Sequence, residues 1–250
     1  MKNKLLQLLG DNARADRPAP TIRAEAAGEV AAIYVYDVID SYWGVSAKGL
    51  VEALASAGAK NVDLHINSPG GDVFEARAMV SAVRAHQAKG NKVTAYIDGL
   101  AASAATYLAL AGDQVHIADG GMFMVHNSWT LAWGNKAELR STADLLEKID
   151  GTISADYARK TGATVDQIAA WMDAETWFTA EEAKAAGFVD SVIQPPKADD
   201  AKAARWNLAA YPNAPKPADK PAPTDSDLDA HAVNVAALNR SRYEALLPQN

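Results

Sequence analysis

Ser103 stands in a stretch of small residues that suits a catalytic nucleophile. Residues 99–105 read Gly-Leu-Ala-Ala-Ser-Ala-Ala, so little side-chain bulk would block the approach of a substrate carbonyl. Alternating apolar residues before this stretch predict a strand, and the apolar residues after it predict a buried helix that ends at Gly112. At a strand-to-helix turn the first N–H groups of the helix are unpaired, and the helix dipole favours negative charge. The same pattern is found in tightly packed helix starts, so the interpretation needs support from other residues.

His126 is the histidine best placed to act as a general base for that serine. It follows a predicted short strand, 122–125, and so lies at an edge where α/β sheets present reactive groups. A neutral imidazole within hydrogen-bond reach can take the serine proton and return it to a leaving amine. Two other histidines, His65 and His116, fall within predicted strands, where we interpret them as structural.

The pair Gly70 and Gly71 follows another predicted strand, 62–66, in the loop Asn-Ser-Pro-Gly-Gly. Glycines at the end of a parallel strand let backbone N–H groups face a substrate. The N–H groups of Gly71 and Ala104 are therefore candidates for an oxyanion hole. The same loop would let an extended substrate peptide pair alongside it. The alternative interpretation is that the two glycines only permit unusual backbone angles.

Composition excludes several other kinds of chemistry. The 250-residue chain contains no cysteine, so it has no thiol nucleophile, disulfide or Cys-ligated metal centre. Its net charge of −7 argues against a nucleic-acid-binding surface, which normally shows as a basic stripe. The sequence shows no run of about 20 apolar residues and no signal-peptide pattern, so we expect a cytoplasmic protein without a membrane span.

The distribution of proline divides the chain into three parts. Pro69 is the only proline between residues 21 and 194, whereas most of the 11 prolines lie at Pro195 or later. We therefore expect a loose arm over residues 1–25, one folded domain over 26–194 and a tail over 195–250 that is too poor in apolar residues to form a core. Apolar residues near the end of that tail predict a short C-terminal helix.

Within the domain, predicted strands and helices alternate along the chain. Hydrophobic periodicity and turn residues place strands at 30–36, 62–66, 92–97, 114–118, 122–125 and 188–193. Capping residues and helical periodicity place helices at 46–57, 72–88, after Ser103, at 135–160, from Thr164 and at 179–187. This alternation predicts an α/β protein with a mostly parallel sheet covered by helices.

Four motifs follow one another along the chain: Ser-Pro-Gly-Gly, Gly-Leu-Ala-Ala-Ser-Ala-Ala, Met-Val-His-Asn and Glu-Thr-Trp-Phe-Thr-Ala-Glu-Glu-Ala. Their order and approximate spacing resemble those of the ClpP family of serine peptidases, over about residues 28–194. More narrowly, the wording of the second and fourth motifs resembles the ClpP-related head-maturation (prohead) proteases of tailed phages. The resemblance implies a ClpP/crotonase-like fold, Ser103 as nucleophile and His126 as general base. It also implies a protruding handle helix at 135–160, through which two rings of subunits stack, and no metal or organic cofactor.

The resemblance further implies an acidic third member of the catalytic set before Trp177, where two candidates stand. Asp173 and Glu175 are two residues apart, so in an extended segment their side chains share a face and periodicity does not choose between them. Matching the motif without a gap places Glu175 in the acid position, although housekeeping members of the family carry Asp there. A Ser-His-Glu set is chemically adequate because hydrolases of other folds use it. The residue after the nucleophile is Ala104, whereas housekeeping members of the family usually carry Met there. This difference should not affect an oxyanion contact, because that contact is made by the backbone N–H.

We therefore expect a serine endopeptidase that processes capsid or scaffold proteins during phage head assembly. Its subunits would form homo-oligomeric rings in the host cytoplasm or the procapsid interior, without a nucleic-acid or membrane partner. The tail would contact the scaffold or be cleaved by the enzyme itself. One alternative is the proteolytic subunit of an ATP-dependent Clp-type protease, which works with an ATPase partner. Two alternatives of other classes are a crotonase-like acyl-CoA enzyme, in which a Ser-His pair has no required role, and a structural ring without catalytic activity.

Overall fold

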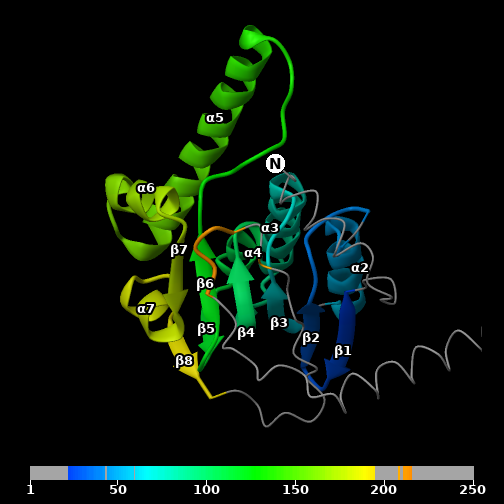
Figure 1. The fold of residues 1–250 in the computed structure, drawn as a ribbon. Coiled ribbons are helices and arrows are strands. Elements are labelled where there is room, and N and C mark those ends of the chain that lie inside the picture. The colour runs from blue at the N-terminus through cyan, green and yellow to red at the C-terminus, as the bar shows by residue number, and fades with distance from the viewer. Residues whose placement is uncertain (1–21, 43, 59, 195–207, 209–210, 216–250) are drawn as a thin grey trace, which may run out of the picture. The chain divides into compact units, whose positions relative to one another are not determined.

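The computed structural model describes residues 22–42, 44–58, 60–194, 208 and 211–215, and eight strands in this part of the chain form one sheet. The main path runs in the order β1-β2-β3-β4-β5-β8, with β1 antiparallel to β2 and the other neighbours parallel (Figure 1). These strands are β1 Arg23–Ala27, β2 Val30–Val35, β3 Asn61–Ser68, β4 Val93–Ala102, β5 Gln114–Ala118 and β8 Ser191–Ile193. The predicted α/β class with a mostly parallel sheet is confirmed.

Strand β4 pairs with different neighbours at its two ends. Residues 94–97 pair with β5, whereas residues 100–102 pair with β6 (Met122–Val125). Strand β6 then pairs antiparallel with β7 (Thr176–Thr179). The last residues of β4 and β6 therefore lie side by side, immediately before Ser103 and His126. The predicted strand 92–97 stops short of this second pairing, and β1 and β7 are absent from the predicted set.

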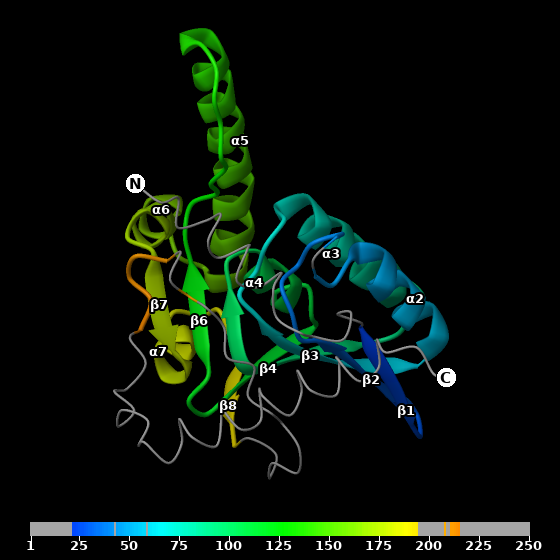
Figure 2. The ribbon, with the colours of Figure 1, turned by 45° about the vertical axis from the view of Figure 1, so that its right-hand side comes forward.

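Three helices cover one face of the sheet: α2 (Ala47–Ala57), α3 (Val73–Gln87) and α4 (Ala104–Ala109) (Figure 2). Helices α2 and α3 begin at the predicted positions, directly after Ser46 and Asp72. The Ser46 side chain accepts from the N–H of Gly49, and the Asp72 carboxylate accepts from the N–H groups of Phe74 and Glu75. Each cap satisfies backbone donors that the first helical turn leaves unpaired.

Helix α5 (Lys136–Thr161) is the longest in the described residues and rises away from the sheet (Figures 1 and 2). Asn135 and Glu138 form the capping box at its start, and Gly162 ends it in the left-handed conformation. Its buried residues, Ile153, Ser154 and Tyr157, all lie near its C-terminal end, whereas nearly all of residues 136–145 are exposed, so the N-terminal part of the helix projects from the core. The predicted long helix at 135–160 is confirmed. Helices α6 (Val165–Asp173) and α7 (Ala180–Ala185) follow it.

The main core lies between the sheet and its covering helices, because alternate strand residues point to that face. In β3, for example, Val62, Leu64 and Ile66 are buried, and the residues between them are half-buried on the opposite face. On that opposite face His65 Nδ1 lies 2.9 Å from the Asp98 carboxylate, and His116 Nδ1 lies 2.7 Å from the Ser191 hydroxyl. Both histidines have satisfied partners away from Ser103, which agrees with their interpretation as structural.

The expected loose arm lies almost entirely outside the described residues, and so does the expected C-terminal helix. Strand β1 begins at Arg23, inside the range assigned to that arm. None of the helices in the described part of the chain is long and apolar enough to cross a bilayer.

Candidate active site

Ser103 stands at the sharp turn between β4 and α4. Its backbone has φ 53° and ψ −126°, a conformation that costs a non-glycine residue about 1–3 kcal/mol. Three hydrogen bonds hold the turn: the Ser103 N–H donates to the Met124 carbonyl at 2.9 Å, and the Ser103 carbonyl accepts from the Thr106 N–H at 3.0 Å and from the Thr106 hydroxyl at 2.6 Å. The Ser103 side chain caps no helix N–H, so its hydroxyl is available to another partner.

The C-terminal part of α5 supports this turn from behind. The Tyr157 hydroxyl lies 2.6 Å from the Thr106 hydroxyl. Because Thr106 already donates its proton to the Ser103 carbonyl, Tyr157 is the donor in this contact. Burial raises the pKa of Tyr157, so the phenol keeps the proton that it donates. A chain of two hydroxyls thus links the buried end of the projecting helix to the backbone of Ser103.

The structure brings Ser103 and His126 together. His126 Nε2 lies 2.7 Å from Ser103 Oγ, a distance typical of a strong hydrogen bond. Burial lowers the pKa of His126 from its ordinary 6.5 to about 4, because removal from water disfavours the charged imidazolium. The imidazole is therefore neutral at pH 7 and can accept the proton of the serine hydroxyl.

The glycine pair lies against the serine turn. A Cβ on Gly70, whose φ is 89°, would come within 2.5 Å of the Ala102 carbonyl and 2.8 Å of the Ala104 nitrogen, so only glycine fits there. A Cβ on Gly71 would meet the Ile39 carbonyl at 2.1 Å. The loop is fixed by two hydrogen bonds with Ile39, whose N–H donates to the Gly70 carbonyl and whose carbonyl accepts from the residue after Gly71.

Two backbone N–H groups at this point have no acceptor in the described part of the chain: those of Gly71 and of Ala104, the first residue of α4. Gly71 is exposed, and Ala104 directly follows the nucleophile position. Two unpaired donors next to a serine hydroxyl are the arrangement that stabilises the oxyanion of a tetrahedral intermediate. The predicted oxyanion donors thus lie in a suitable place, and their role remains a proposal.

A cleft of about 340 Å³ contains both Ser103 and His126 in its wall. The remaining lining comes from residues 38–40, the loop 69–73, residues 128–131 and Tyr211. Trp129 and Leu131 in this lining are partly exposed apolar side chains, at 45% and 43%. The volume and the apolar side chains suit an extended peptide with side chains of moderate size.

Neither candidate acid forms a hydrogen bond with His126 within the described residues. The Glu175 carboxylate accepts from Trp177 Nε1 at 3.2 Å and from the N–H of Asn213 at 2.8 Å. The Asp173 carboxylate accepts from the Asn127 side chain at 2.7 Å. The structure therefore assembles the serine and the histidine, but it leaves Glu175 engaged with other donors.

Tyr211 is a residue of this site that the sequence reasoning missed. It is 9% exposed, its ring packs edge-on against the His126 imidazole at 5.4 Å, and it lines the cleft. The proline-rich composition around it predicts an unstructured tail. The one local indication of packing in the sequence is that Tyr211, an aromatic residue, lies close to Leu208. Both residues belong to the same small apolar cluster in the structure.

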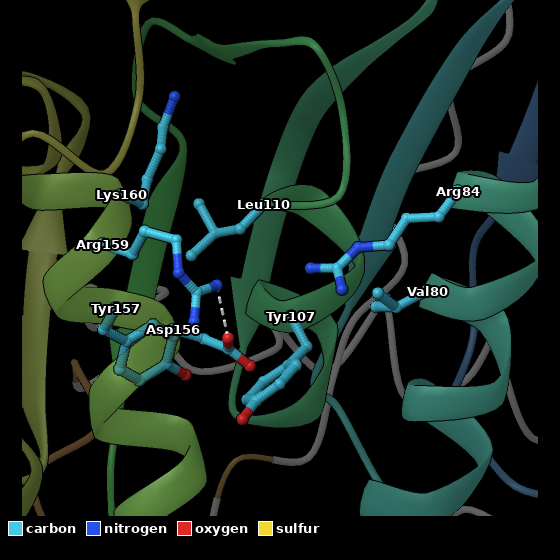
Figure 3. Close-up of a pocket in the computed structure, with 8 residues that line it drawn as sticks. All are labelled: Val80, Arg84, Tyr107, Leu110, Asp156, Tyr157, Arg159 and Lys160. Atoms are coloured by element: carbon cyan, nitrogen blue, oxygen red, sulfur yellow. Dashed lines mark hydrogen bonds and ion pairs between the residues drawn. The ribbon is translucent and has the colours of Figure 1, made fainter. Parts of the chain in front are cut away.

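A second hollow, of about 270 Å³, lies between α3, α4 and α5 (Figure 3). Figure 3 shows Arg84 and Arg159 approaching it from opposite sides, with Asp156 bound to Arg159 at 2.7 Å. Lys160 at its rim pairs with Asp190 at 2.9 Å. No serine or histidine lines this hollow, and no cluster of His, Asp or Glu side chains suited to a metal ion occurs among the described residues.

Comparison with known proteins agrees with this geometry. The family model described as Clp protease matches residues 30–196. The ATP-dependent Clp protease proteolytic subunit 1 of Leifsonia xyli subsp. xyli is 31% identical over 150 residues, which cover 59% of this chain and 74% of that protein. The ATP-dependent Clp protease proteolytic subunit 3 of Streptomyces coelicolor is 32% identical over 136 residues, which cover 54% of this chain and 61% of that protein. A proteolytic subunit from Bacteroides fragilis is 29% identical over 136 residues, or 54% of this chain and 64% of that protein. The chain thus spans about three fifths of the length of two of these relatives.

Proposed function

The chain belongs to the Clp protease family of ClpP-like serine peptidases, and on that basis we propose that it cleaves internal peptide bonds through Ser103, His126 and Glu175. The observation that carries the proposal is the 2.7 Å contact between Ser103 Oγ and His126 Nε2. The neutral state of the imidazole and the unpaired N–H groups of Gly71 and Ala104 support the same reaction.

The reaction proceeds in two halves. Ser103 Oγ attacks the scissile carbonyl carbon while its proton passes to His126 Nε2, and the carbonyl oxygen becomes an oxyanion bound by the N–H groups of Gly71 and Ala104. The intermediate then collapses, the C–N bond breaks, and His126 gives its proton to the leaving amine. Water attacks the resulting ester with His126 again as base, which releases the second peptide and restores the serine hydroxyl.

The third role belongs to an acid that holds the imidazole in the correct tautomer and stabilises the imidazolium as it forms. We assign this role to Glu175. Its carboxylate is half-buried and lies beside β7, which pairs with β6, the strand that ends immediately before His126. Asp173 is exposed, whereas Glu175 is half-buried, so Asp173 is the weaker candidate.

The setting in which the peptidase works has two candidates. The relatives named above are proteolytic subunits of ATP-dependent Clp proteases, which supports a homo-oligomeric ring supplied with substrate by an ATPase partner. The second candidate is maturation of phage capsid or scaffold proteins. Its support is the amino-acid sequence of the motifs around Ser103 and Glu175, which resembles that of phage head-maturation proteases. The settings differ in one measurable requirement: an unfoldase and ATP are needed to degrade a folded protein in the first, whereas a capsid or scaffold protein is cleaved without them in the second.

Ser103→Ala provides the direct test of the chemistry. We expect the variant to fold normally, to lose reaction with a fluorophosphonate probe and to lose peptide hydrolysis by several orders of magnitude. The matched control is Ser128→Ala, because Ser128 lines the same cleft but its hydroxyl donates to the Leu146 carbonyl of α5 at 3.4 Å rather than contacting His126. Retention of more than a few per cent of the activity in Ser103→Ala, with unchanged probe labelling, would remove Ser103 from the nucleophile role.

A further inference from the structure

Leu208 and Tyr211–Ala214, here called the strap, pack against the candidate active site although they belong to the proline-rich tail. Tyr211 and Leu208 form a small apolar cluster with residues of β4 and β6, the two strands that position the serine and the histidine. The Tyr211 hydroxyl donates to the Pro69 carbonyl at 2.8 Å. The strap is therefore attached to the loop that carries the glycine pair as well as to the strands.

The Tyr211 ring contacts His126 and lies close to Glu175. Its edge packs on the imidazole at 5.4 Å with an interplanar angle of 76°, and it packs on Trp177 at 5.9 Å. Trp177 is itself a hydrogen-bond donor to the Glu175 carboxylate. Burial raises the pKa of Tyr211, and the nearby negative charge of Glu175 raises it further. A neutral ring thus takes up space beside both the imidazole and the carboxylate.

The strap also holds Glu175 directly. The backbone N–H of Asn213 donates to Glu175 Oε1 at 2.8 Å, and the Asn213 side chain donates to the Ala174 carbonyl at 2.8 Å. A carboxylate next to a histidine raises its pKa, yet burial alone accounts for the shift of His126, which is downward. Glu175 is therefore engaged with the strap and not with the imidazole.

We infer that the strap is an autoinhibitory latch, which binds Glu175 through the Asn213 N–H and places the Tyr211 ring against His126. The inference rests on the proposed role of Glu175 as the acid of the catalytic set. In the latched form the serine and the histidine are in contact, but the imidazole lacks the acid that fixes its tautomer. Release of the strap takes the Asn213 N–H away from Glu175 and the Tyr211 ring away from His126. The Glu175 carboxylate then accepts a hydrogen bond from the second ring nitrogen of His126.

Two substitutions in the full chain release the latch by different routes. Asn213→Pro removes the N–H that donates to Glu175, and it disfavours the turn in which the Ala214 N–H donates to the Tyr211 carbonyl. Tyr211→Ala removes the ring that packs on His126 and leaves the Asn213 N–H in place. Pro215→Ala is the matched control, because Pro215 follows the strap directly and is exposed.

The primary measurement is the pKa of His126, followed by NMR on protein with ¹³C-labelled histidine and assigned with His126→Asn. We expect a pKa near 4 in the parent and in Pro215→Ala, and a pKa above the ordinary 6.5 in Asn213→Pro, because the carboxylate then stabilises the imidazolium. Rehydration alone would bring the pKa only up to about 6.5. Adding Glu175→Gln to Asn213→Pro should therefore lower the pKa to 6.5 or below.

The outcomes separate the latch from the proposed function. A pKa of His126 at or below 6.5 in both release variants, or a raised pKa that Glu175→Gln does not lower, overturns the latch. If the latch holds and the chain is a peptidase, both release variants gain kcat/KM for peptide hydrolysis by about 10-fold to 10⁴-fold. A raised, Glu175-dependent pKa in a protein whose Ser103 reacts with no fluorophosphonate supports the latch and overturns the proposed function instead. Lower kcat/KM in both release variants than in an active parent overturns the latch, because the strap would then be part of the active form.

Discussion

Lowering the pH from about 7.5 to about 5.5 tests the protonation state of His126 in the unmodified chain. The reaction of Ser103 with a fluorophosphonate needs a neutral imidazole to accept the hydroxyl proton. Burial lowers the pKa of His126 to about 4, so acidification over this range should leave the base in its active form. An exposed histidine with the ordinary pKa of 6.5 would instead become protonated and inactive.

The magnitude follows from the fraction of neutral imidazole. With a pKa near 4, about 97% of the imidazole is neutral at about pH 5.5, and the labelling rate should be nearly equal at the two pH values. With a pKa of 6.5 the neutral fraction at about pH 5.5 is about 9%, and the rate would fall about tenfold. The two cases are far enough apart for a simple rate measurement to separate them.

The assay is the pseudo-first-order rate of probe attachment to Ser103, followed by intact mass in buffers of constant ionic strength. Unfolding must be excluded at the lower pH, and the circular dichroism spectrum of the same samples provides that control. A tenfold slower reaction at about pH 5.5, with an unchanged spectrum, would refute the argument that His126 is desolvated in the parent chain. In that case the labelling rate should fall to half of its maximum near pH 6.5 rather than near pH 4.

Two further predictions concern the residues around the base. Gly70→Ala should abolish peptide hydrolysis and lower the free energy of unfolding by more than about 2 kcal/mol, because positive φ and close backbone contacts both oppose a Cβ. Gly28→Ala, at positive φ with open space, should cost only about 1 kcal/mol and keep activity, and equal losses in urea unfolding would contradict the steric argument. In the Asn213→Pro background, Glu175→Gln should lower kcat by about 10²-fold to 10⁴-fold through the wrong histidine tautomer, whereas Asp173→Asn should change it less than about twofold. The reverse ranking in a peptide assay would assign the acid role to Asp173.

The parts of the fold that the sequence predicts well depend on local patterns. The caps at Asp72 and Asn135 identify the starts of α3 and α5, because a side chain that satisfies the first N–H groups of a helix acts within three residues. The alternation in β3 identifies its buried face in the same local way. Each of these patterns spans only a few neighbouring residues, so the sequence alone is enough to recognise it.

The parts that are missed depend on pairing between distant segments. Residues 99–102 are Gly-Leu-Ala-Ala, which by composition resembles a turn, yet they extend β4 because residues 100–102 pair with β6. Strand β7 is found only through its antiparallel pairing with β6. This pairing matters most for the site, because it places the ends of β4 and β6 together and so brings Ser103 to His126. The sequence predicts that Ser103 and His126 are the reacting pair. Their hydrogen bond, however, depends on the register between β4 and β6, which the local sequence does not show.

The position of Glu175 illustrates the same limit for an individual side chain. Spacing and motif place Glu175 in the acid position, and the structure places it beside β7 and near Tyr211. What the motif does not contain is the competing donor, the N–H of Asn213, which comes from a segment 38 residues further along the chain. A tail of low apolar content can still occupy a site when one aromatic ring and one backbone N–H find partners there.

Backbone strain links the two ends of the proposed catalytic set. Among the described residues, Ser103 and Glu175 are the only non-glycine positions with positive φ, at 53° and 47°. Such a conformation costs about 1–3 kcal/mol and persists only where surrounding contacts hold it. At Ser103 those contacts come from strand pairing and from Thr106, which belong to the folded domain. At Glu175 the backbone N–H donates to the Met172 carbonyl at 3.1 Å, also within the folded domain, whereas the carboxylate is shared between Trp177 Nε1 and the Asn213 N–H of the strap. Release of the strap as we propose it would therefore remove one of the two hydrogen bonds to the Glu175 carboxylate, while the backbone turns at Ser103 and Glu175 keep their contacts within the folded domain.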